Sequence, residues 1–165
     1  MALTAAPNHS QAGDRTARAT LRSYRLGDWQ AMYALDLVCF EPVFQFSRGA
    51  MRGFAEAPGA VTVLAEAQGE LAGFCLAQLE QQTGYVVTLD VAPAWRRRGL
   101  ARRLIAEVES RLQSAGAVGM ELHVFTGNEE AIRFYEAIGY AQAGVAKDFY
   151  AQSLHALLYR KQLPA

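Results

Sequence analysis

The sequence contains few cysteines and no excess of either charge, and these absences argue against several classes of protein. Only 2 of the 165 residues are cysteines, Cys39 and Cys75, which lie far apart in apolar surroundings. A disulfide framework or a cysteine-based metal site is therefore disfavoured, and we predict two buried free thiols and no metal. Because 16 basic residues balance 16 acidic ones, no overall field favours nucleic acid or a membrane surface as a partner.

The sequence also lacks the hydrophobic segments that direct a chain to or across a membrane. No segment approaches the roughly 20 apolar residues that a transmembrane helix needs. The N-terminus has no charged start followed by an apolar core, which is the pattern of a secretory signal peptide. We therefore expect a cytoplasmic protein with no membrane partner.

What the sequence does contain is enough apolar material for one globular core. Hydrophobic residues make up 52% of the chain and charged residues 19%, which is typical of a single domain of this length. Residues 1–19 are rich in Ala, Thr, Asn, Ser and Gln without periodicity, and we expect them to form a flexible N-terminal leader. The domain would then comprise residues 20–165.

Apolar periodicity and turn residues predict alternating strands and helices along this domain. Strands are expected at 20–24, 61–66, 71–80, 85–91, 120–125, 140–150 and 155–163, and helices are expected to begin after Asp28, Ser47, Gly99 and Asn128. Because the helix after Gly99 crosses between two strands, the strands that it joins should be parallel. We predict a mixed α/β fold, with a mostly antiparallel central sheet, one parallel pair and flanking helices.

The segment 85–101 carries the strongest functional signal, because a strand leads through a basic, glycine-bearing turn into an amphipathic helix. The first amides of a helix have no intrahelical partner and the helix dipole adds partial positive charge, so an anion is stabilised there. Arg96, Arg97 and Arg98 strengthen this field, and Gly99 lets the backbone approach a ligand closely. The turn lacks the Gly-Lys-Ser/Thr of nucleotide hydrolases and the three glycines of dinucleotide folds. The alternative is a solvated arginine run before an ordinary helix.

Two motifs resemble the GCN5-related N-acetyltransferase (GNAT) superfamily. Arg96-x-x-Gly-x-Ala, preceded by Leu89-x-Val-x-Pro, is similar to the coenzyme A loop of that superfamily. Residues 128–140 are similar to its Asn-x-x-Ala-x-x-x-Tyr-x-x-x-Gly-Phe/Tyr signature, at the same spacing. The resemblance implies the GNAT fold and acetyl-CoA as the co-substrate.

The resemblance also assigns residues to the coenzyme. The implied coenzyme-binding residues are Leu89, Asp90, Val91, Arg96, Arg97, Arg98, Gly99, Leu100, Ala101, Asn128 and Tyr135. Asn128 offers a polar helix cap that faces the ligand, and Tyr135 lies two helical turns further on a similar face. A phenol there would reach a departing thiolate. Without the motif, Tyr135 is interpreted as a core aromatic residue.

Within the superfamily the chain is most similar to the protein N-terminal acetyltransferases, both the bacterial ribosomal-protein-alanine type and the NatE-type catalytic subunit. The similarity lies in Phe40-Glu-Pro-Val, Tyr85-x-x-Thr-Leu, Leu122-His-Val and Lys-Asp-Phe-Tyr150. It implies that Phe40, Pro42, Val43 and Tyr150 contact the acceptor. In the NatE-type enzymes a Tyr at the position of Tyr85 and a His at the position of His123 are assigned to general-base chemistry. The bacterial alanine enzymes carry a Glu where this chain has His123.

Acetyl transfer needs a neutral amine, a donor for the developing oxyanion and a proton for the leaving sulfur. The imidazole of His123 titrates near neutrality and would take the ammonium proton directly or through a water, with help from Tyr85. The alternative is a structural histidine, since both faces of its strand are expected to be covered. Glu121, two residues away on the same face, is either a second carboxylate for the amine or a salt-bridging residue.

The strand before the coenzyme loop has a role of its own. The amides around Leu89 and Val91, where the two parallel strands are expected to separate, would hold the pantetheine arm and polarise the thioester carbonyl. Cys39 and Cys75 are predicted to lie away from the coenzyme loop. No nucleophilic side chain is then needed, and transfer would be direct within a ternary complex.

The sequence favours an acetyl-CoA-dependent N-acetyltransferase that acts on a primary amine, in the first place the α-amine of a protein or peptide N-terminus. A small-molecule acetyltransferase for a polyamine, an amino acid or an antibiotic amine would use the same coenzyme site with a different acceptor cleft. A third hypothesis is an acyl-CoA-binding regulatory module without turnover, which the presence of both His123 and Tyr135 disfavours. Either a monomer or a homodimer is compatible with the sequence.

Overall fold

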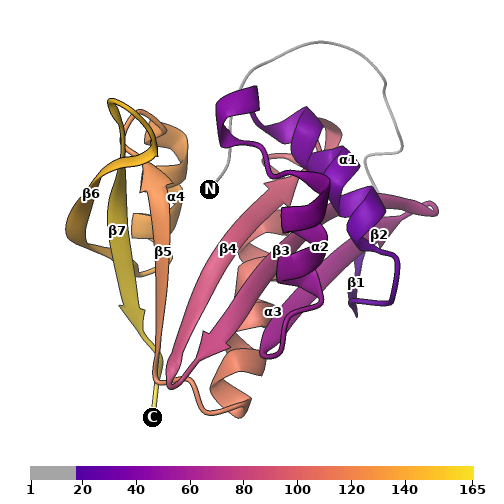
Figure 1. The fold of residues 1–165 in the computed structure, drawn as a ribbon. Coiled ribbons are helices and arrows are strands. Elements are labelled where there is room, and N and C mark those ends of the chain that lie inside the picture. The colour runs from indigo at the N-terminus through magenta and orange to yellow at the C-terminus, as the bar shows by residue number, and fades with distance from the viewer. Residues whose placement is uncertain (1–17) are drawn as a thin grey trace.

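The computed structural model describes residues 18–165 as a single sheet flanked by helices (Figure 1). The elements are β1 (Thr20–Ser23), α1 (Trp29–Cys39), η1 (Pro42–Phe44), α2 (Arg48–Ala55), β2 (Ala60–Ala67), β3 (Glu70–Glu80), β4 (Thr83–Val91), η2 (Pro93–Trp95), α3 (Leu100–Ser114), β5 (Gly119–Phe125), α4 (Glu129–Ala137), β6 (Ala141–Ala151) and β7 (Leu154–Gln162). Apart from the two short 3-10 turns, η1 and η2, this is the order that the sequence predicts.

The start of the domain differs by one residue from the predicted boundary. Ala19, which the sequence assigned to the leader, is 2% exposed and packs in the main core. Its carbonyl also accepts a hydrogen bond from the guanidinium of Arg103. Residues 1–17 of the predicted leader lie outside the described residues.

The sheet has the order β1-β2-β3-β4-β5-β7-β6, and only its β4–β5 pair is parallel. The predicted fold class is therefore confirmed. The parallel pair follows from connectivity, since α3 carries the chain from the end of β4 back to the start of β5.

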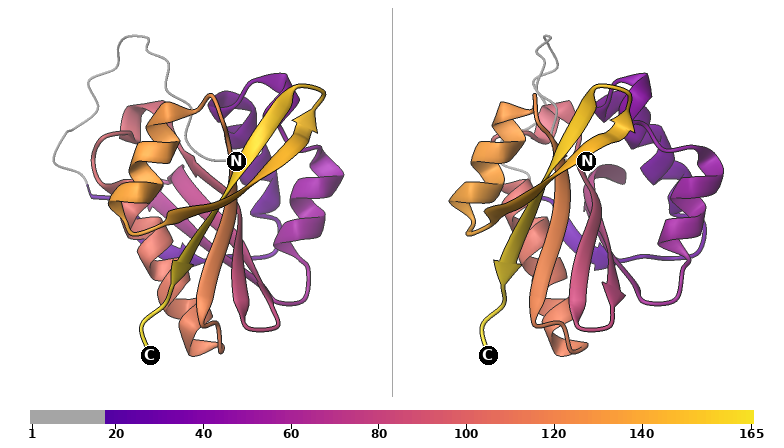
Figure 2. Two further views of the ribbon diagram at one scale, coloured as in Figure 1. Left: turned by 90° about the vertical axis from the view of Figure 1, so that its left-hand side faces the viewer. Right: turned by 60° about the vertical axis from the view of Figure 1, so that its left-hand side comes forward.

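Helices pack on both faces of the sheet, mainly over β2, β3 and β4. The helices α1 and α2 contact β2, β3 and β4 on one face, and α3 contacts the same strands on the other. Figure 2 shows α3 and α4 together on one side of the sheet and α1 and α2 on the opposite side. Two hydrophobic clusters result, a large one with α3 and α4 and a smaller one with α1 and α2.

Polar side chains cap two of the predicted helices. The Ser47 hydroxyl accepts from the Ala50 amide at the start of α2, and the Asn128 side chain accepts from the Ala131 amide at the start of α4. Asp28 precedes α1 as predicted, yet no cap hydrogen bond from its side chain is found among the described residues. Its carboxylate instead accepts from Arg22, because a charged partner binds a carboxylate more strongly than a helix amide does.

The parallel strands separate before they end, as the sequence predicts. The ladder between β4 and β5 runs from Thr83↔Gly119 to Val86↔Leu122. Both strands continue for several residues beyond that point, to Val91 in β4 and to Phe125 in β5. The sheet therefore opens between the two strands, next to the start of α3.

A β-bulge at Val87 reverses the facing of the second half of β4. Opposite β3, Val86 pairs with Ala77 and Thr88 with Leu76, so that Val87 is an extra residue. As a result, Tyr85 and Val87 pack with the α1–α2 cluster, whereas Leu89 packs with the α3 cluster. Simple alternation would have placed all of these odd-numbered residues on one face.

Candidate active site

The start of α3 forms a cradle for an anion. Gly99 is the N-cap residue of α3 with φ 76°, and no side chain among the described residues caps this end. A Cβ atom placed on Gly99 would meet nothing within 4 Å, but this positive φ is unfavourable for other residues. Because the first amides of α3 lack intrahelical partners, they are available to a negatively charged group.

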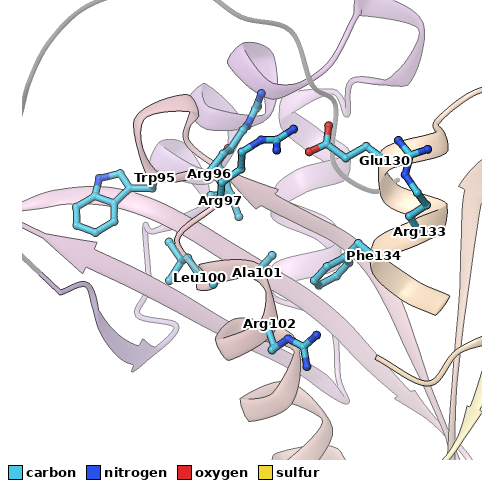
Figure 3. Close-up of a pocket in the computed structure, with 11 residues that line it drawn as sticks. Trp95, Arg96, Arg97, Leu100, Ala101, Arg102, Glu130, Arg133 and Phe134 are labelled. Carbon is cyan, nitrogen blue, oxygen red and sulfur yellow. The ribbon is translucent and has the colours of Figure 1, made fainter. Parts of the chain in front are cut away.

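A pocket of about 520 Å³ lies beside this cradle, between the β4–α3 loop, the first turn of α3, and α4 (Figure 3). Its lining comprises Val91, Trp95, Arg96, Arg97, Gly99, Leu100, Ala101, Arg102, Glu130, Arg133 and Phe134. Four arginines against one glutamate make this pocket electropositive. In Figure 3 one of the two loop arginines, Arg96 and Arg97, extends its guanidinium toward Glu130 on α4.

Most residues that the sequence assigned to the coenzyme line this pocket, namely Val91, Arg96, Arg97, Gly99, Leu100 and Ala101. The others lie elsewhere. Arg98 stacks over the Trp95 ring at 4.8 Å, while Leu89 and Asp90 are buried within the fold. Asn128 caps α4, and Tyr135 lies in the main core.

Five residues of the pocket were missed by the sequence analysis: Trp95, Arg102, Glu130, Arg133 and Phe134. A signal for some of them was present. Arg102 lies in the first turn of α3, and Glu130, Arg133 and Phe134 have the i, i+3, i+4 spacing of one helix face. That this face of α4 is turned toward the β4–α3 loop depends on the tertiary fold.

Tyr85 and His123 meet across the strands β4 and β5. The Tyr85 hydroxyl lies 2.9 Å from Nδ1 of His123. On its other side the imidazole stacks on Phe149 of β6, with ring centroids 4.2 Å apart and an interplanar angle of 14°. Residues from three strands thus hold one phenol and one imidazole in a fixed relation beside the opening of the sheet.

Burial sets the protonation of this pair. It lowers the pKa of His123 below the ordinary value of 6.5, although the charge of Glu121 opposes that shift. It raises the pKa of Tyr85 to about 12, with Glu121 adding to the effect. At neutral pH the imidazole is therefore neutral and the phenol protonated. In the tautomer that carries its proton on Nε2, the imidazole accepts from Tyr85 at Nδ1.

The loop of residues 40–46 and the β6–β7 hairpin form the aromatic wall of the site. Phe44 lies 5.0 Å from Phe125 and 5.0 Å from Tyr150, measured between ring centroids. Val43 beside it is 44% exposed, whereas Phe40 is only 6% exposed and packs beneath the loop. Phe44, which the sequence analysis did not select, thus reaches the hairpin.

Comparison with known proteins identifies the family. The model of the acetyltransferase (GNAT) family matches residues 29–140, which is more than half of the chain. The chain belongs to this family. The ribosomal protein bS18-alanine N-acetyltransferase of Salmonella typhimurium is 30% identical over 84 residues, which cover 51% of this chain and 57% of that protein. The match therefore spans little more than half the length of this curated relative.

Solved structures confirm the GNAT fold. The ribosomal-protein-S18-alanine N-acetyltransferase of Escherichia coli superposes with a TM-score of 0.80 at 20% identity, over 90% of this chain and 96% of that one. A nourseothricin acetyltransferase superposes with a TM-score of 0.73 at 22% identity, over 88% of this chain and 99% of that one. Since enzymes named for a protein and for nourseothricin share the fold, the fold alone does not identify the acceptor.

Glu121 forms a salt bridge with Arg160. Its carboxylate lies 2.7 Å from Nε of Arg160 on β7 and forms an ion pair at the protein surface. Of the two roles that the sequence allowed, the structure shows the salt bridge.

The face of β5 that carries His123 is more open than the sequence suggested. Met120, Leu122 and Val124 are buried and alternate with half-buried residues, among them His123. The expectation that both faces of this strand are covered is therefore wrong. The physical reason is that α1 and α2 cover β2, β3 and β4 and stop short of β5.

Tyr135, the predicted proton donor, is buried in the main core. Its side chain is 1% exposed, and its ring packs edge-on against Phe134 at 5.2 Å and Tyr140 at 5.5 Å. Burial raises the pKa of its phenol well above the ordinary value, so the hydroxyl stays protonated. The ring is thus a core aromatic residue, and its hydroxyl retains a proton to donate.

The cysteines are free and buried, as predicted, but the predicted position of Cys39 is wrong. Its Sγ donates to the carbonyl of Val91, 3.4 Å away, at the end of the strand that leads into the coenzyme loop. The end of α1 packs against the end of β4, a long-range contact that local sequence does not encode. Burial raises the pKa of Cys39 to about 12, so it is a thiol at neutral pH and a poor nucleophile.

The geometry of the site fits acetyl-CoA. The glycine cradle and the four arginines suit a pyrophosphate, and the separated strands leave the second half of β4 unpaired with β5. Among residues 18–165, no group of three or more His, Cys, Asp and Glu side chains could hold a metal ion. Within the same residues, no helix is both long and apolar enough to cross a membrane.

Proposed function

We propose that this chain is an acetyl-CoA-dependent N-acetyltransferase that transfers the acetyl group directly to a primary amine. The observation that carries the proposal is the hydrogen bond between the Tyr85 hydroxyl and Nδ1 of His123, beside the opening of the sheet. The pocket supplies a coenzyme site, and the pair supplies a base. Family membership supports the same reaction.

The coenzyme site works mainly through backbone groups and positive charge. The free amides at Gly99, Leu100 and Ala101 bind the pyrophosphate, while Arg96 and Arg97 neutralise its charge. When bound, acetyl-CoA supplies the thioester that the amine attacks. The amides around Leu89 and Val91 hold the pantetheine arm and stabilise the developing oxyanion.

Tyr85 and His123 remove the proton of the acceptor ammonium group. Because Tyr85 donates to Nδ1, its oxygen accepts a proton from the amine as its own proton passes to His123. The lowered pKa of His123 keeps this route open at neutral pH, since only the neutral imidazole accepts a proton. Tyr135, whose phenol stays protonated, donates to the leaving sulfur. The buried thiol of Cys39 argues against a covalent acetyl-enzyme.

The acceptor that the walls of the site favour is the α-amine of a protein or peptide N-terminus. Phe44, Phe125 and Tyr150 form an aromatic wall suited to a first side chain and an extended backbone. The Tyr150 hydroxyl is buried and has no hydrogen-bond partner among the described residues, so it is available to a peptide group. A polyamine would require acidic residues, and Glu121 is already paired with Arg160.

Release of free thiol from acetyl-CoA tests the proposal. The purified protein is incubated with acetyl-CoA and, in parallel, with free N-terminal peptides, the same peptides blocked at the α-amine but carrying lysine, and polyamines. We expect thiol release with the free N-terminal peptides alone. Release with polyamines would identify a small-molecule enzyme. No release with any amine, together with tight acetyl-CoA binding, would favour a regulatory module.

A further inference from the structure

Two buried carboxyl groups, Asp36 of α1 and Asp90 of β4, have no role in the mechanism above. Their carboxyl groups lie close enough together that each shifts the pKa of the other, and the residues are 0% and 1% exposed. Among residues 18–165, neither Asp36 Oδ1 nor Asp90 Oδ2 has a donor. Two ionised carboxylates would both be acceptors, and their charges would repel. A single proton shared between the two oxygens satisfies both of them.

The outer oxygens of the pair are bound to two different parts of the site. Asp36 Oδ2 accepts from the backbone amide of Phe46, 2.9 Å away, at the end of the acceptor loop of residues 40–46. Asp90 Oδ1 accepts from the hydroxyl of Thr88 within β4. The pair therefore links the acceptor loop to the strand that leads into the coenzyme cradle.

The surroundings of the pair favour one proton and one negative charge. Burial raises the pKa of both carboxyls, and the charge of Asp36 raises that of Asp90 further. The other titratable groups that sense Asp90 are Cys39 of α1, Cys75 of β3 and Tyr135 of α4, all neutral at neutral pH. The nearby cation, Arg96, uses its Nε to bind the carbonyl of Val91. One proton and one negative charge on the pair therefore fit these surroundings.

We propose that Asp36 and Asp90 are positioning residues that share one proton and thereby fix the acceptor loop against the coenzyme strand. The inference rests on the proposed function, because that function assigns the loop to the acceptor and the strand to the coenzyme. Neither carboxyl is required to touch a reacting atom. Loss of the pair should therefore weaken use of the acceptor more than use of acetyl-CoA.

Steady-state kinetics with matched variants tests the kinetic part. Asp36→Ala removes the acceptor of the Phe46 amide and should raise the acceptor KM roughly tenfold, with the acetyl-CoA KM within about twofold of wild type. Asp36→Asn keeps an oxygen for Phe46 and offers an N–H to Asp90, so it should restore the acceptor KM. Equal acceptor KM values for Asp36→Ala, Asp36→Asn and wild type would overturn the proposal.

Amide hydrogen exchange of Phe46 tests the link without any turnover. Asp90→Asn supplies an N–H in place of the shared proton and should keep the Phe46 amide protected. Asp90→Leu leaves Asp36 without that donor and should lower the protection about tenfold or more, although the Phe46 amide donates to Asp36 and not to residue 90. Wild-type protection in Asp90→Leu would overturn the link. If Asp90→Leu fails to fold, Asp90→Ala, which also lacks a donor for Asp36, gives the same decision.

The two experiments separate this inference from the proposed function. If wild-type protein transfers no acetyl group to any amine, the proposed function fails, while the Phe46 exchange still reports on the carboxyl pair. If acetyl transfer is normal but the exchange rate of the Phe46 amide is the same in Asp90→Leu as in wild type, only the inference fails.

Discussion

The two sides of the site are built in different ways. The coenzyme side comes mainly from one continuous segment, from the end of β4 through the loop into α3, and presents backbone amides and arginines. The acceptor side is assembled from the loop of residues 40–46, β5 and the β6–β7 hairpin, and presents aromatic rings. One side is local and polar. The other depends on contacts between distant segments.

This difference indicates which properties are general and which are particular to this chain. A cradle of backbone amides recognises a pyrophosphate whatever side chains surround it, because every residue except proline carries an N–H. An aromatic wall changes whenever one of its segments changes length or sequence. We therefore expect coenzyme binding to tolerate most side-chain substitutions and acceptor choice to respond to many.

The largest effect is expected where backbone geometry itself is altered. Gly99→Glu adds bulk, strain at φ 76° and a negative charge at the cradle, and should weaken acetyl-CoA binding roughly a hundredfold or more in calorimetric titration. Gly27→Glu is the matched control, since Gly27 also has a positive φ and an open Cβ direction but lies outside the pocket. Unchanged affinity in Gly99→Glu would refute the cradle.

The next effect concerns the base on the acceptor side. The acidic limb of the rate–pH profile should have its midpoint below 6.5, because burial lowers the pKa of His123 and activity falls as the imidazole becomes protonated. His123→Ala should lower the rate about a hundredfold or more and remove the limb. Tyr85→Phe should lower the rate and leave the limb.

Glu121→Gln is the control for that assignment, since it keeps the shape of the side chain and removes its charge. We expect the acidic limb to remain in this variant, with the midpoint moved slightly down because the carboxylate no longer stabilises the imidazolium. If the limb persists in His123→Ala and disappears in Glu121→Gln, the carboxylate is the base.

Tyr135→Phe tests the junction of the two sides. It removes the hydroxyl and preserves the packed ring, so we expect kcat to fall roughly tenfold to a hundredfold with little change in acetyl-CoA affinity or in Tm. Full activity in Tyr135→Phe would contradict the proton-donor role and leave Tyr135 with a packing role only.

The smallest effect is expected from single arginines. Arg96→Ala should weaken acetyl-CoA binding roughly twofold to fivefold, because the backbone amides of the cradle persist. Arg98→Ala should have less effect, since Arg98 stacks over Trp95 and does not line the pocket. Titrations at low and high salt should show the Arg96 effect shrinking as salt rises. Equal effects of the two substitutions would indicate that the arginines act through their overall positive charge and that Arg96 makes no specific contact with the coenzyme.

The sequence was most informative where structure follows from neighbouring residues. The order of elements, the parallel pair, the caps at Ser47 and Asn128 and the glycine at the start of α3 all have local signals. Contacts between segments were missed. The approach of Cys39 to Val91 and the insertion of Phe44 against Tyr150 depend on how α1 and the hairpin pack, which no short motif records.

The bulge at Val87 makes the number of residues in β4 matter as much as their identity. Every residue after it, including Leu89 and Val91, owes its side of the sheet to that one extra position. Removing a residue there would turn the following side chains over and lead the chain into α3 from the wrong face, even if every motif remained intact. For protein engineering, this strand should accept substitutions far more readily than a change in length.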